Sequence, residues 1–401
     1  MSEINIEINS EINSEINSEE EYLRNINRLI EDKLYNQSLK LVIKAIEQYP
    51  QSRLLRNKKG WCLYYVKIKN KPTNPESRCA FIEAVNNIRT MYSSQDKFVP
   101  RKLALFKMIE YSDECGISTE DIIQCYNELG CEELSDVPFS AVIDGRKISL
   151  SSDKEKWYMG FSKLMFEQGN YEYALQLCED ALHTICFVNQ NKQWLIKRQA
   201  DCLINLGREA ESIDILHELS ITLPHWSTYS KLAVAYAKAN NVEKANKYFS
   251  LACHDINYVK VNLYREYADF LKDTNPKLAY YHLKLTEMIF RQQGWFIKPD
   301  LKKAIEELGD ERCNNYKVTI TLKEFWKSKM YMGQERIEGR ITNILSHGKA
   351  GFIRDDDKQD YYFLMSNVQD SIHNIFVGMR VSFYAQQGMK GMDAVEVALQ
   401  S

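Results

Sequence analysis

Four segments of the chain carry the same order of small and large apolar residues, and this repeat constrains the fold more than any other feature of the sequence. One small residue marks each segment, namely Ala174, Ser212, Ala245 and Ala279, at spacings of 38, 33 and 34 residues. Larger apolar residues surround each of them at the three- and four-residue spacing of a helix. A repeat of this length predicts a pair of helices in every unit.

The residue types indicate how such a pair packs. Small residues let two antiparallel helices approach closely, and large residues fill the space beside them. Glycines such as Gly169 and Gly207 stand where the chain has to turn. One hairpin cannot bury its apolar face alone, so the units are expected to stack as an α-solenoid.

The pattern and its period resemble the tetratricopeptide repeat, whose unit has about 34 residues. The resemblance is strongest over 155–290. A further unit fits at 19–52, where Ser38, Val42, Ala45 and Pro50 stand at matching offsets, and Gly60 opens the next one. Between about 66 and 130 the pattern is helical but lacks the signature residues. We therefore expect a tetratricopeptide-like solenoid over 19–310.

The first residues of the chain differ from this pattern. The unit EINS recurs within 7–18, and residues 3–20 hold six glutamates and no basic residue. Asn and Ser are poor helix formers, so 1–18 is expected to be a disordered acidic segment, with a marginal helix as the alternative.

One segment interrupts the helical pattern. Residues 139–150, FSAVIDGRKISL, alternate around Asp144-Gly145, which is a signature of a tight β-hairpin. The hairpin is expected either to pack as a spacer between helical units or to present a binding edge.

The composition changes again over 311–336. Residues 312–336 hold six Lys or Arg against two Glu, with Tyr316, Phe325, Trp326 and Tyr331 among them. Cations and rings together suit single-stranded nucleic acid. They suit an amphipathic segment docked between two domains equally well, so both interpretations of this basic aromatic linker stay open.

Five short alternating segments follow from Ile337, with Gly- or Asp-rich turns between them. They are IEGRITNIL, KAGFIRD, DYYFLMS, MRVSFYAQ and MDAVEVAL. Five strands in about 65 residues predict a small closed barrel of the OB type over 337–401. The predicted fold class is mostly α with a C-terminal all-β module.

The motifs of this module resemble the cold-shock domain. That family opens with a Gly-x-Val-type strand, followed by a Lys-Gly-aromatic-Gly-Phe-Ile strand. It closes with a Lys-Gly-x-x-Ala turn. The matching segments here are Gly339-Arg340-Ile341, Lys349 to Ile353, the aromatic strand from Asp360 to Ser366, and Lys390 to Ala394. The resemblance implies a barrel that holds single-stranded nucleic acid on stacked rings.

Alternation of the strands places Phe352 and Tyr362 side by side on one face. The family's platform has more rings, because Asn343, Ala350, Leu364 and Met365 stand here at its aromatic or His positions. The remaining platform is expected to bind weakly, since each stacked base is worth about 1–3 kcal/mol. The candidate nucleic-acid-binding residues are Phe352, Tyr362, Arg340, His347, Lys349, Arg354, Lys390 and Trp326.

The first helix of each repeat is expected to line a concave groove. The residues that the repeat register turns outward there are rich in lysine, which suits an acidic peptide or a nucleic-acid backbone. A solvated helical face without a ligand is the alternative. The candidate peptide-binding residues are Lys156, Lys163, Trp194, Lys197, Asn205, Ser230, Lys238, Tyr264 and Lys272.

Other classes of function find no support in the sequence. No catalytic motif or phosphate loop occurs, and none of the ten cysteines forms a CxxC pair. Asp355, Asp356 and Asp357 are expected to form a solvated hairpin tip and not a metal site. With no apolar stretch of membrane-spanning length and no signal peptide, a soluble, cytoplasmic, non-enzymatic protein without a cofactor or small-molecule substrate is expected.

Two hypotheses about function remain. In the first, the chain is an adaptor that binds single-stranded RNA or DNA, RNA being favoured, while the solenoid groove recruits a protein. In the second, the barrel is a degenerate docking module and the whole chain is a protein-interaction scaffold.

Overall fold

The computed structural model describes residues 18–91, 99–143, 145–254, 256–309, 314–369, 375–388 and 391–400. The acidic segment 1–17, Asp144 and Lys390 lie outside these ranges. The chain divides into two compact units, Met1–Phe161 and Ser162–Ser401. Each unit is described by itself.

The first unit is built from helices that pair along the chain. They are α2 (Glu19–Glu31), α3 (Tyr35–Gln48), α4 (Arg53–Leu63), the π-helix η1 (Tyr64–Ile68), α5 (Pro75–Met91), α6 (Val99–Glu110), α7 (Ser112–Cys115), α8 (Thr119–Leu129) and the 3-10 helix η2 (Cys131–Glu133). Ser18 and Ser52 cap α2 and α4 by accepting hydrogen bonds from backbone N–H groups of the first turn. Tyr22, Val42 and Ala45 are buried where α2, α3 and α4 meet.

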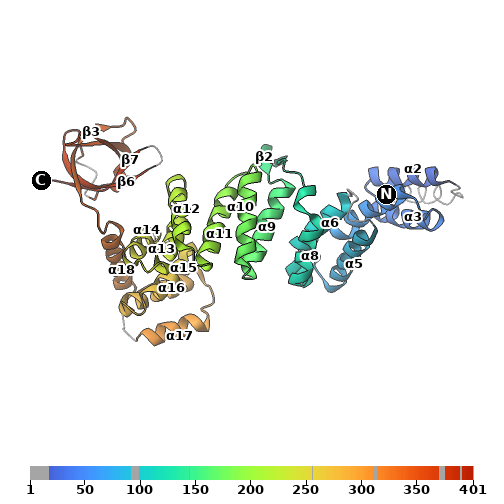
Figure 1. Cartoon of the computed structure of the whole chain (residues 1–401), viewed down its shortest axis with the longest axis horizontal. Helices are drawn as coiled ribbons and strands as arrows, with labels where there is room; N and C mark the ends of the chain where they lie inside the picture. The colour runs from blue at the N-terminus through green and yellow to red at the C-terminus, as the bar shows by residue number, and fades with distance from the viewer. Residues whose placement is uncertain are drawn as a thin grey trace. The chain divides into compact units, whose positions relative to one another are not determined.

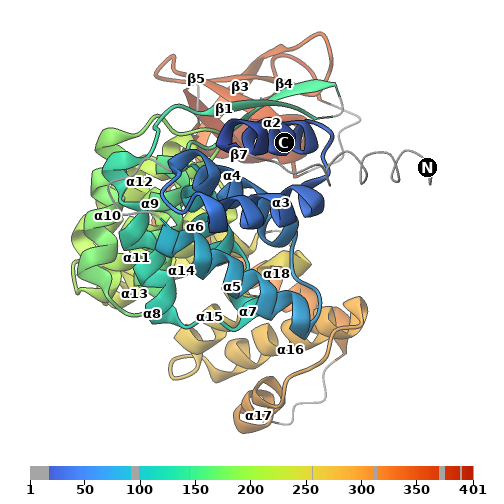
Figure 2. The same ribbon diagram turned by 90° about the vertical axis from the view of Figure 1, so that its right-hand side faces the viewer.

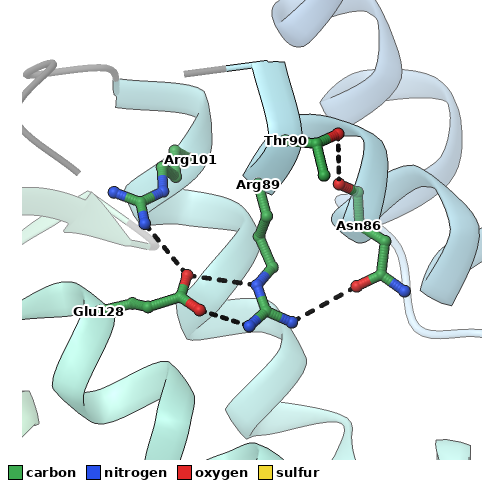
Figure 3. A network of polar contacts seen from close by, with 5 residues as sticks. All are labelled: Asn86, Arg89, Thr90, Arg101 and Glu128. Atoms are coloured by element: carbon green, nitrogen blue, oxygen red, sulfur yellow. Dashed lines mark hydrogen bonds and ion pairs between the residues drawn. The ribbon is translucent and has the colours of Figure 1, made fainter. Parts of the chain in front are cut away.

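A carboxylate joins three helices of the first unit (Figure 3). Glu128 of α8 accepts hydrogen bonds from Arg89 of α5, at 3.2 Å to Nε, and from Arg101 of α6, at 3.1 Å. Arg89 also donates to the side chain of Asn86 at 3.4 Å. Burial raises the pKa of Glu128, but the hydrogen bond from Arg89 and the charges of both arginines lower it on balance. The carboxylate is therefore held ionised between α5, α6 and α8.

The predicted hairpin is present. Strands β1 (Phe139–Ile143) and β2 (Arg146–Leu150) pair antiparallel, with Phe139 opposite Leu150. Gly145 has φ +74°, the left-handed conformation that a tight turn requires. Phe139, Val142, Ile148 and Leu150 are exposed, so the pair presents apolar side chains to solvent.

Helix α9 (Asp153–Glu167) spans the division, and the second unit continues with further helical hairpins (Figure 1). They are α10 (Tyr171–Thr184), α11 (Asn191–Asn205), α12 (Glu209–Thr222), α13 (Trp226–Lys238), α14 (Val242–Cys253), the 3-10 helix η3 (Tyr258–Lys260), α15 (Val261–Leu271), α16 (Pro276–Gln293) and α17 (Pro299–Leu308). Figure 2 shows α15, α16 and α17 as neighbours. The small residues Ala174, Ser212, Ala245 and Ala279 are fully buried, as close helix packing requires. The helical-repeat prediction is confirmed.

The segment predicted as a linker is mostly a helix, α18 (Asn315–Met330), which packs against α14 and α16. Its buried residues are Val318, Leu322, Trp326 and Met330, which recur every four positions and so form one stripe. Val318, Leu322 and Trp326 belong to the apolar core of α14, α15 and α16. The helix is therefore part of the solenoid.

Strands β3 (Ile337–Ile344), β4 (Ala350–Asp355), β5 (Asp360–Leu364), β6 (Arg380–Gln387) and β7 (Met392–Leu399) form a closed barrel in the order β3-β4-β5-β7-β6, with β6 pairing back to β3. The short 3-10 helix η4 (Met365–Asn367) follows β5. Ile341, Ile353, Phe363 and Phe383 fill the interior. The five predicted strands and the fold class, mostly α with a C-terminal all-β module, are confirmed.

Gly351 brings β3, β4 and β5 together inside the barrel wall. A Cβ at this position would collide with the backbone oxygen of Asn343 and would lie 2.7 Å from Cε1 of Phe363. Only glycine leaves room for this approach. Among the described residues, none of the helices combines the length and apolar character that crossing a membrane requires.

Candidate nucleic-acid interface

Phe352 of β4 and Tyr362 of β5 are direct cross-strand partners, as the alternation predicts. Their ring centroids lie 5.7 Å apart with an interplanar angle of 67°. Both side chains are partly exposed, whereas the alternate residues Ile353, Tyr361 and Phe363 face the barrel interior. The two rings therefore form a small aromatic surface on the outside of the barrel.

Two arginines lie two residues further along the strands than these rings, on the same face. Arg340 of β3 is the register partner of Arg354 of β4, which in turn pairs with Asp360 of β5. Arg354 donates to both carboxylate oxygens of Asp360, at 2.7 and 2.8 Å. This hydrogen bond lowers the pKa of Asp360. Arg340 donates to the carbonyl of Gly378 at 3.4 Å. Both arginines are exposed, and the register places them next to the rings along the same strands.

The loop before β4 carries two further candidates. His347 is exposed, and its Nδ1 accepts a hydrogen bond from the backbone N–H of Lys349 at 3.1 Å. Lys349 is exposed and forms no ion pair with any residue that the structure describes. Its ammonium group is thus available to a phosphate. Lys390 lies outside the described residues.

Trp326 takes a different place from the one expected. Its side chain is 1 % exposed, and Nε1 donates to Nε2 of His282 at 2.9 Å. The ring of Tyr264 stacks on it with centroids 6.0 Å apart. Because both the N–H and the ring faces are occupied inside the core, Trp326 contributes no stacking surface, and we leave it out of the interface.

The expected groove residues divide into an exposed and a buried set. Lys156 and Lys163 of α9, Trp194 and Asn205 of α11, Lys238 of α13 and Lys272 at the end of α15 are exposed. Lys163 forms an ion pair with Glu167 at 3.6 Å and Lys156 one with Asp153 at 3.6 Å. These exposed side chains remain candidates for contact with a ligand.

The other three expected groove residues are buried, because the repeat register alone does not fix how far each helix rotates. Lys197 is 5 % exposed, and its ammonium donates to Ser227 at 2.5 Å and lies 4.8 Å above the ring of Trp194. Ser230 donates to Glu266 at 3.4 Å. Tyr264 lies in the core against Trp326. These side chains hold neighbouring repeats together and do not line an open surface.

Charges of both signs connect the first helices of consecutive repeats. Arg198 of α11 donates to Ser162 at 2.6 Å, and Asp201 of α11 pairs with Lys231 of α13 at 2.9 Å. Burial raises the pKa of both Asp201 and Glu266, while the charge of Lys231 opposes the rise. No sequence motif marks Arg198, Asp201, Lys231 or Glu266, because only the helix packing brings these four charged residues together.

No protein-family model matches the sequence, and no curated protein matches it. Solved structures that are similar include a tetratricopeptide repeat protein from Parabacteroides merdae, with 16% identity and a TM-score of 0.38 over 72% of this chain and 98% of that one. The anaphase-promoting-complex hetero-tetramer Cut9-Hcn1 has 14% identity and a TM-score of 0.36 over 74% and 50%. The human IFIT1 dimer with PPP-AAAA has 13% identity and a TM-score of 0.32 over 78% and 72%. Because these TM-scores lie below 0.5, we take the fold from the packing described above.

Proposed function

We propose that this protein is a non-catalytic adaptor that binds single-stranded nucleic acid, RNA being favoured, on the outer face of its barrel. The observation that carries the proposal is the cross-strand pair of Phe352 and Tyr362, whose rings are partly exposed on the same face. Rings at this spacing offer a stacking surface to bases of any sequence, and such stacking is worth about 1–3 kcal/mol per base. The cold-shock-like motifs of the sequence agree with this role.

The charges around the rings support a modest affinity. Arg354 lies two residues along β4 from Phe352, with Arg340 opposite it on β3, and Lys349 stands just before β4, but Arg354 is already paired with Asp360. The segment 337–401 carries six basic and eight acidic residues, so it provides no strong long-range attraction for phosphates. Affinity is expected to depend mainly on stacking and to decrease as salt is added.

A fluorescence titration of labelled single-stranded RNA and DNA with the full chain, at two salt concentrations, tests the proposal. The double variant Phe352→Ala, Tyr362→Ala should abolish binding. Leu364→Ala is the matched control, because Leu364 is exposed on the same face of β5 but has no ring. Absence of binding by the wild-type chain at low salt, or equal binding by the double variant and the control, would contradict the proposal.

The second candidate function is recruitment of a protein by the first helices of the repeats. Trp194 is 54% exposed, and the exposed side chains of Lys238 and Lys272 lie on the following repeats. The nearby carboxylates already have partners, since Asp201 pairs with Lys231 and Glu266 accepts a hydrogen bond from Ser230. This balance of free cations and engaged carboxylates suits an acidic peptide.

An array of acidic peptides probed with the full chain tests this second function. Lys238→Glu combined with Lys272→Glu should remove the bound peptides and leave nucleic-acid binding unchanged. Lys303→Glu on α17 is the matched control, since Lys303 is an exposed lysine outside the first helices of these repeats. Peptide binding that persists in the double variant would remove this candidate.

A further inference from the structure

A cleft lies between the barrel and the solenoid within the second unit. It consists of two adjoining cavities, of about 320 and 460 Å³, which share Tyr229, Leu251, Met330, Tyr331 and Gln386 in their linings. Volumes of this size are typical of small-ligand sites. None of the candidate residues from the sequence lines the cleft. Its lining comes mainly from α12, α13, α14 and α18 on the solenoid side and from β6, β7 and η4 on the barrel side.

The walls of the cleft combine rings and amides. The ring centroids of Tyr229 and Tyr248 lie 6.3 Å apart, and His217 lies 5.6 Å from Tyr248 edge-on. Tyr248 is also stacked on Tyr236, with centroids 5.5 Å apart. Tyr331 stacks on Tyr384 of β6 at 4.4 Å. Gln334, Gln386 and Gln387, which carry amide side chains, also line the first cavity. Flat apolar surfaces beside amide donors and acceptors match a nucleobase, which has a ring face and a polar edge.

The cleft also holds a cation. Lys247 of α14 lines the first cavity, is only partly exposed, and forms no ion pair with any residue in the described part of the chain. Burial and the neighbouring charge of Lys244 lower its pKa. Lys327 at the second cavity differs, because it is paired with Glu396 at 2.7 Å. An ammonium group that is partly buried and has no carboxylate partner among the described residues favours an anionic ligand such as a phosphate.

The register of the barrel connects this cleft to the aromatic surface. Consecutive cross-strand partners run from Phe352 to Tyr362, then to Asp393 of β7 and Gln386 of β6. Gln386 is hydrogen-bonded to Tyr229 and lines both cavities. Since neighbouring strands are about 4.8 Å apart, the row from Tyr362 to the cleft spans about 10 Å of barrel surface. Asp393 on this row offers a carboxylate acceptor for base amino groups.

We propose that the cleft is a second nucleotide site, in which a strand that is stacked on Phe352 and Tyr362 continues across Asp393 and places its next nucleotides among Tyr229, Tyr248 and Lys247. This inference rests on the proposed function and deepens it. The phosphate contacts Lys247, and the base packs against the tyrosines. A short oligonucleotide fills only the surface at Phe352 and Tyr362, whereas a longer one reaches both sites.

Titrations of the full chain with fluorescein-labelled oligoadenylates, from the dinucleotide to the octanucleotide, test the proposal. Lys247→Gln should weaken octanucleotide binding about tenfold, and leave dinucleotide binding unchanged. It should also reduce the salt slope by about 0.7, which is the value for one phosphate contact on a single strand. Lys244→Gln is the matched control, because it removes the same charge three residues away on α14 and Lys244 does not line either cavity.

The outcomes separate the two sites. If Lys247→Gln and Lys244→Gln bind the octanucleotide equally, the cleft is not a nucleotide site, and it is either empty or holds a peptide. The proposal for Phe352 and Tyr362 is unaffected by this result. If Phe352→Ala has no effect while Lys247→Gln weakens binding, nucleic acid binds at the cleft without the rings, and the strand that runs from the rings into the cleft is overturned. Failure of the wild-type chain to bind any oligoadenylate overturns both.

Photo-crosslinking of the wild-type chain needs no variant. An octa-adenylate with 4-thiouridine at one end should crosslink to peptides that contain Tyr229, Tyr248 or Tyr331 in addition to those of β4 and β5. Crosslinks restricted to β4 and β5 would overturn the second site.

Discussion

Trp326 Nε1 donates a hydrogen bond to His282 Nε2 at 2.9 Å and thereby joins α18 to α16 inside the solenoid core. The other ring nitrogen of His282, Nδ1, lies 2.7 Å from the carbonyl of Leu278. The imidazole therefore donates through Nδ1 and accepts through Nε2. A second proton would remove the acceptor on which Trp326 depends.

The pH dependence of stability follows from this pair. Burial lowers the pKa of His282 to about 4, against about 6.5 in the unfolded chain. Between these values the unfolded chain binds more protons, so the free energy of unfolding should decrease by about 1.4 kcal/mol per pH unit as the pH falls from about 6.5 to about 4. Urea unfolding at a series of pH values measures it. His282→Gln should lack this part of the slope, and an identical slope in both proteins would refute the assignment.

Removal of the indole donor should weaken the attachment of α18. Trp326→Phe leaves Nε2 of the buried His282 without a partner, which costs about 1–3 kcal/mol. Urea unfolding at neutral pH measures the loss. Tyr316→Phe is the control on the same helix, because Tyr316 is 74% exposed, and it should match the wild type. Equal stability of all three proteins would mean that the hydrogen bond contributes nothing.

The Glu128 network should stabilise the first unit (Figure 3). Glu128→Gln leaves Arg89 and Arg101 without their shared carboxylate. We expect the free energy of unfolding to fall by about 2 kcal/mol. This is less than for a fully buried pair, because the three side chains keep some contact with solvent. Glu211→Gln breaks the exposed pair with Arg208 and should leave the midpoint of thermal unfolding unchanged. A loss no larger in Glu128→Gln than in this control would be the contrary result.

Gly351→Ala should destabilise the barrel by about 2–3 kcal/mol, since the added Cβ collides with the backbone of Asn343 and the ring of Phe363. Thermal unfolding followed by near-ultraviolet circular dichroism would show the loss. Ser346→Ala, at an exposed position in the loop before β4, should have no effect. If the two variants unfold at the same temperature, β3 and β5 have room to move apart.

Thiol reactivity should follow burial. Burial raises the pKa of Cys178 to about 11 and that of Cys202 to about 12, whereas Cys79 and Cys186 are exposed. Iodoacetamide at about pH 8, near the usual thiol value, should modify Cys79 and Cys186 first. Peptide mass mapping after short exposure reads this out, with the urea-unfolded chain as the control. Early modification of Cys178 would contradict its place in the core.

Much of the fold could be predicted from local patterns. The spacing of Ala174, Ser212, Ala245 and Ala279 identified the helices that pack closely, since a small residue is needed wherever two backbones approach. Period-two alternation placed all five strands of the barrel and put Phe352 beside Tyr362. Both patterns depend on contacts that the residue types themselves require.

The environment of α18 was harder to predict, although the sequence held a signal. Basic residues and rings left two interpretations of 312–336 open, a surface for single-stranded nucleic acid and an amphipathic segment docked between two domains. The four-residue spacing of Val318, Leu322, Trp326 and Met330 is the stripe of a helix with one buried face. Composition describes which residues are present, whereas the spacing shows which of them share a face. The cleft had no comparable signal, because Tyr229, Tyr248 and Tyr331 come from separate elements.

The position of α18 has a consequence for how the chain can be cut into stable pieces. Val318, Leu322 and Trp326 complete the solenoid core, whereas Tyr331 stacks on Tyr384 and Arg336 donates to the carbonyls of Ser382 and Glu396 on the barrel, both at 2.7 Å. A truncation before α18 would expose the apolar core residues of the solenoid that α18 covers. It would also leave α18 attached to the barrel with its own apolar side chains exposed. Separation between Met330 and Tyr331 keeps α18 with the solenoid core and Tyr331 with Arg336 on the barrel, and it gives up the Lys327–Glu396 ion pair and the hydrogen bond between Gln386 and Tyr229.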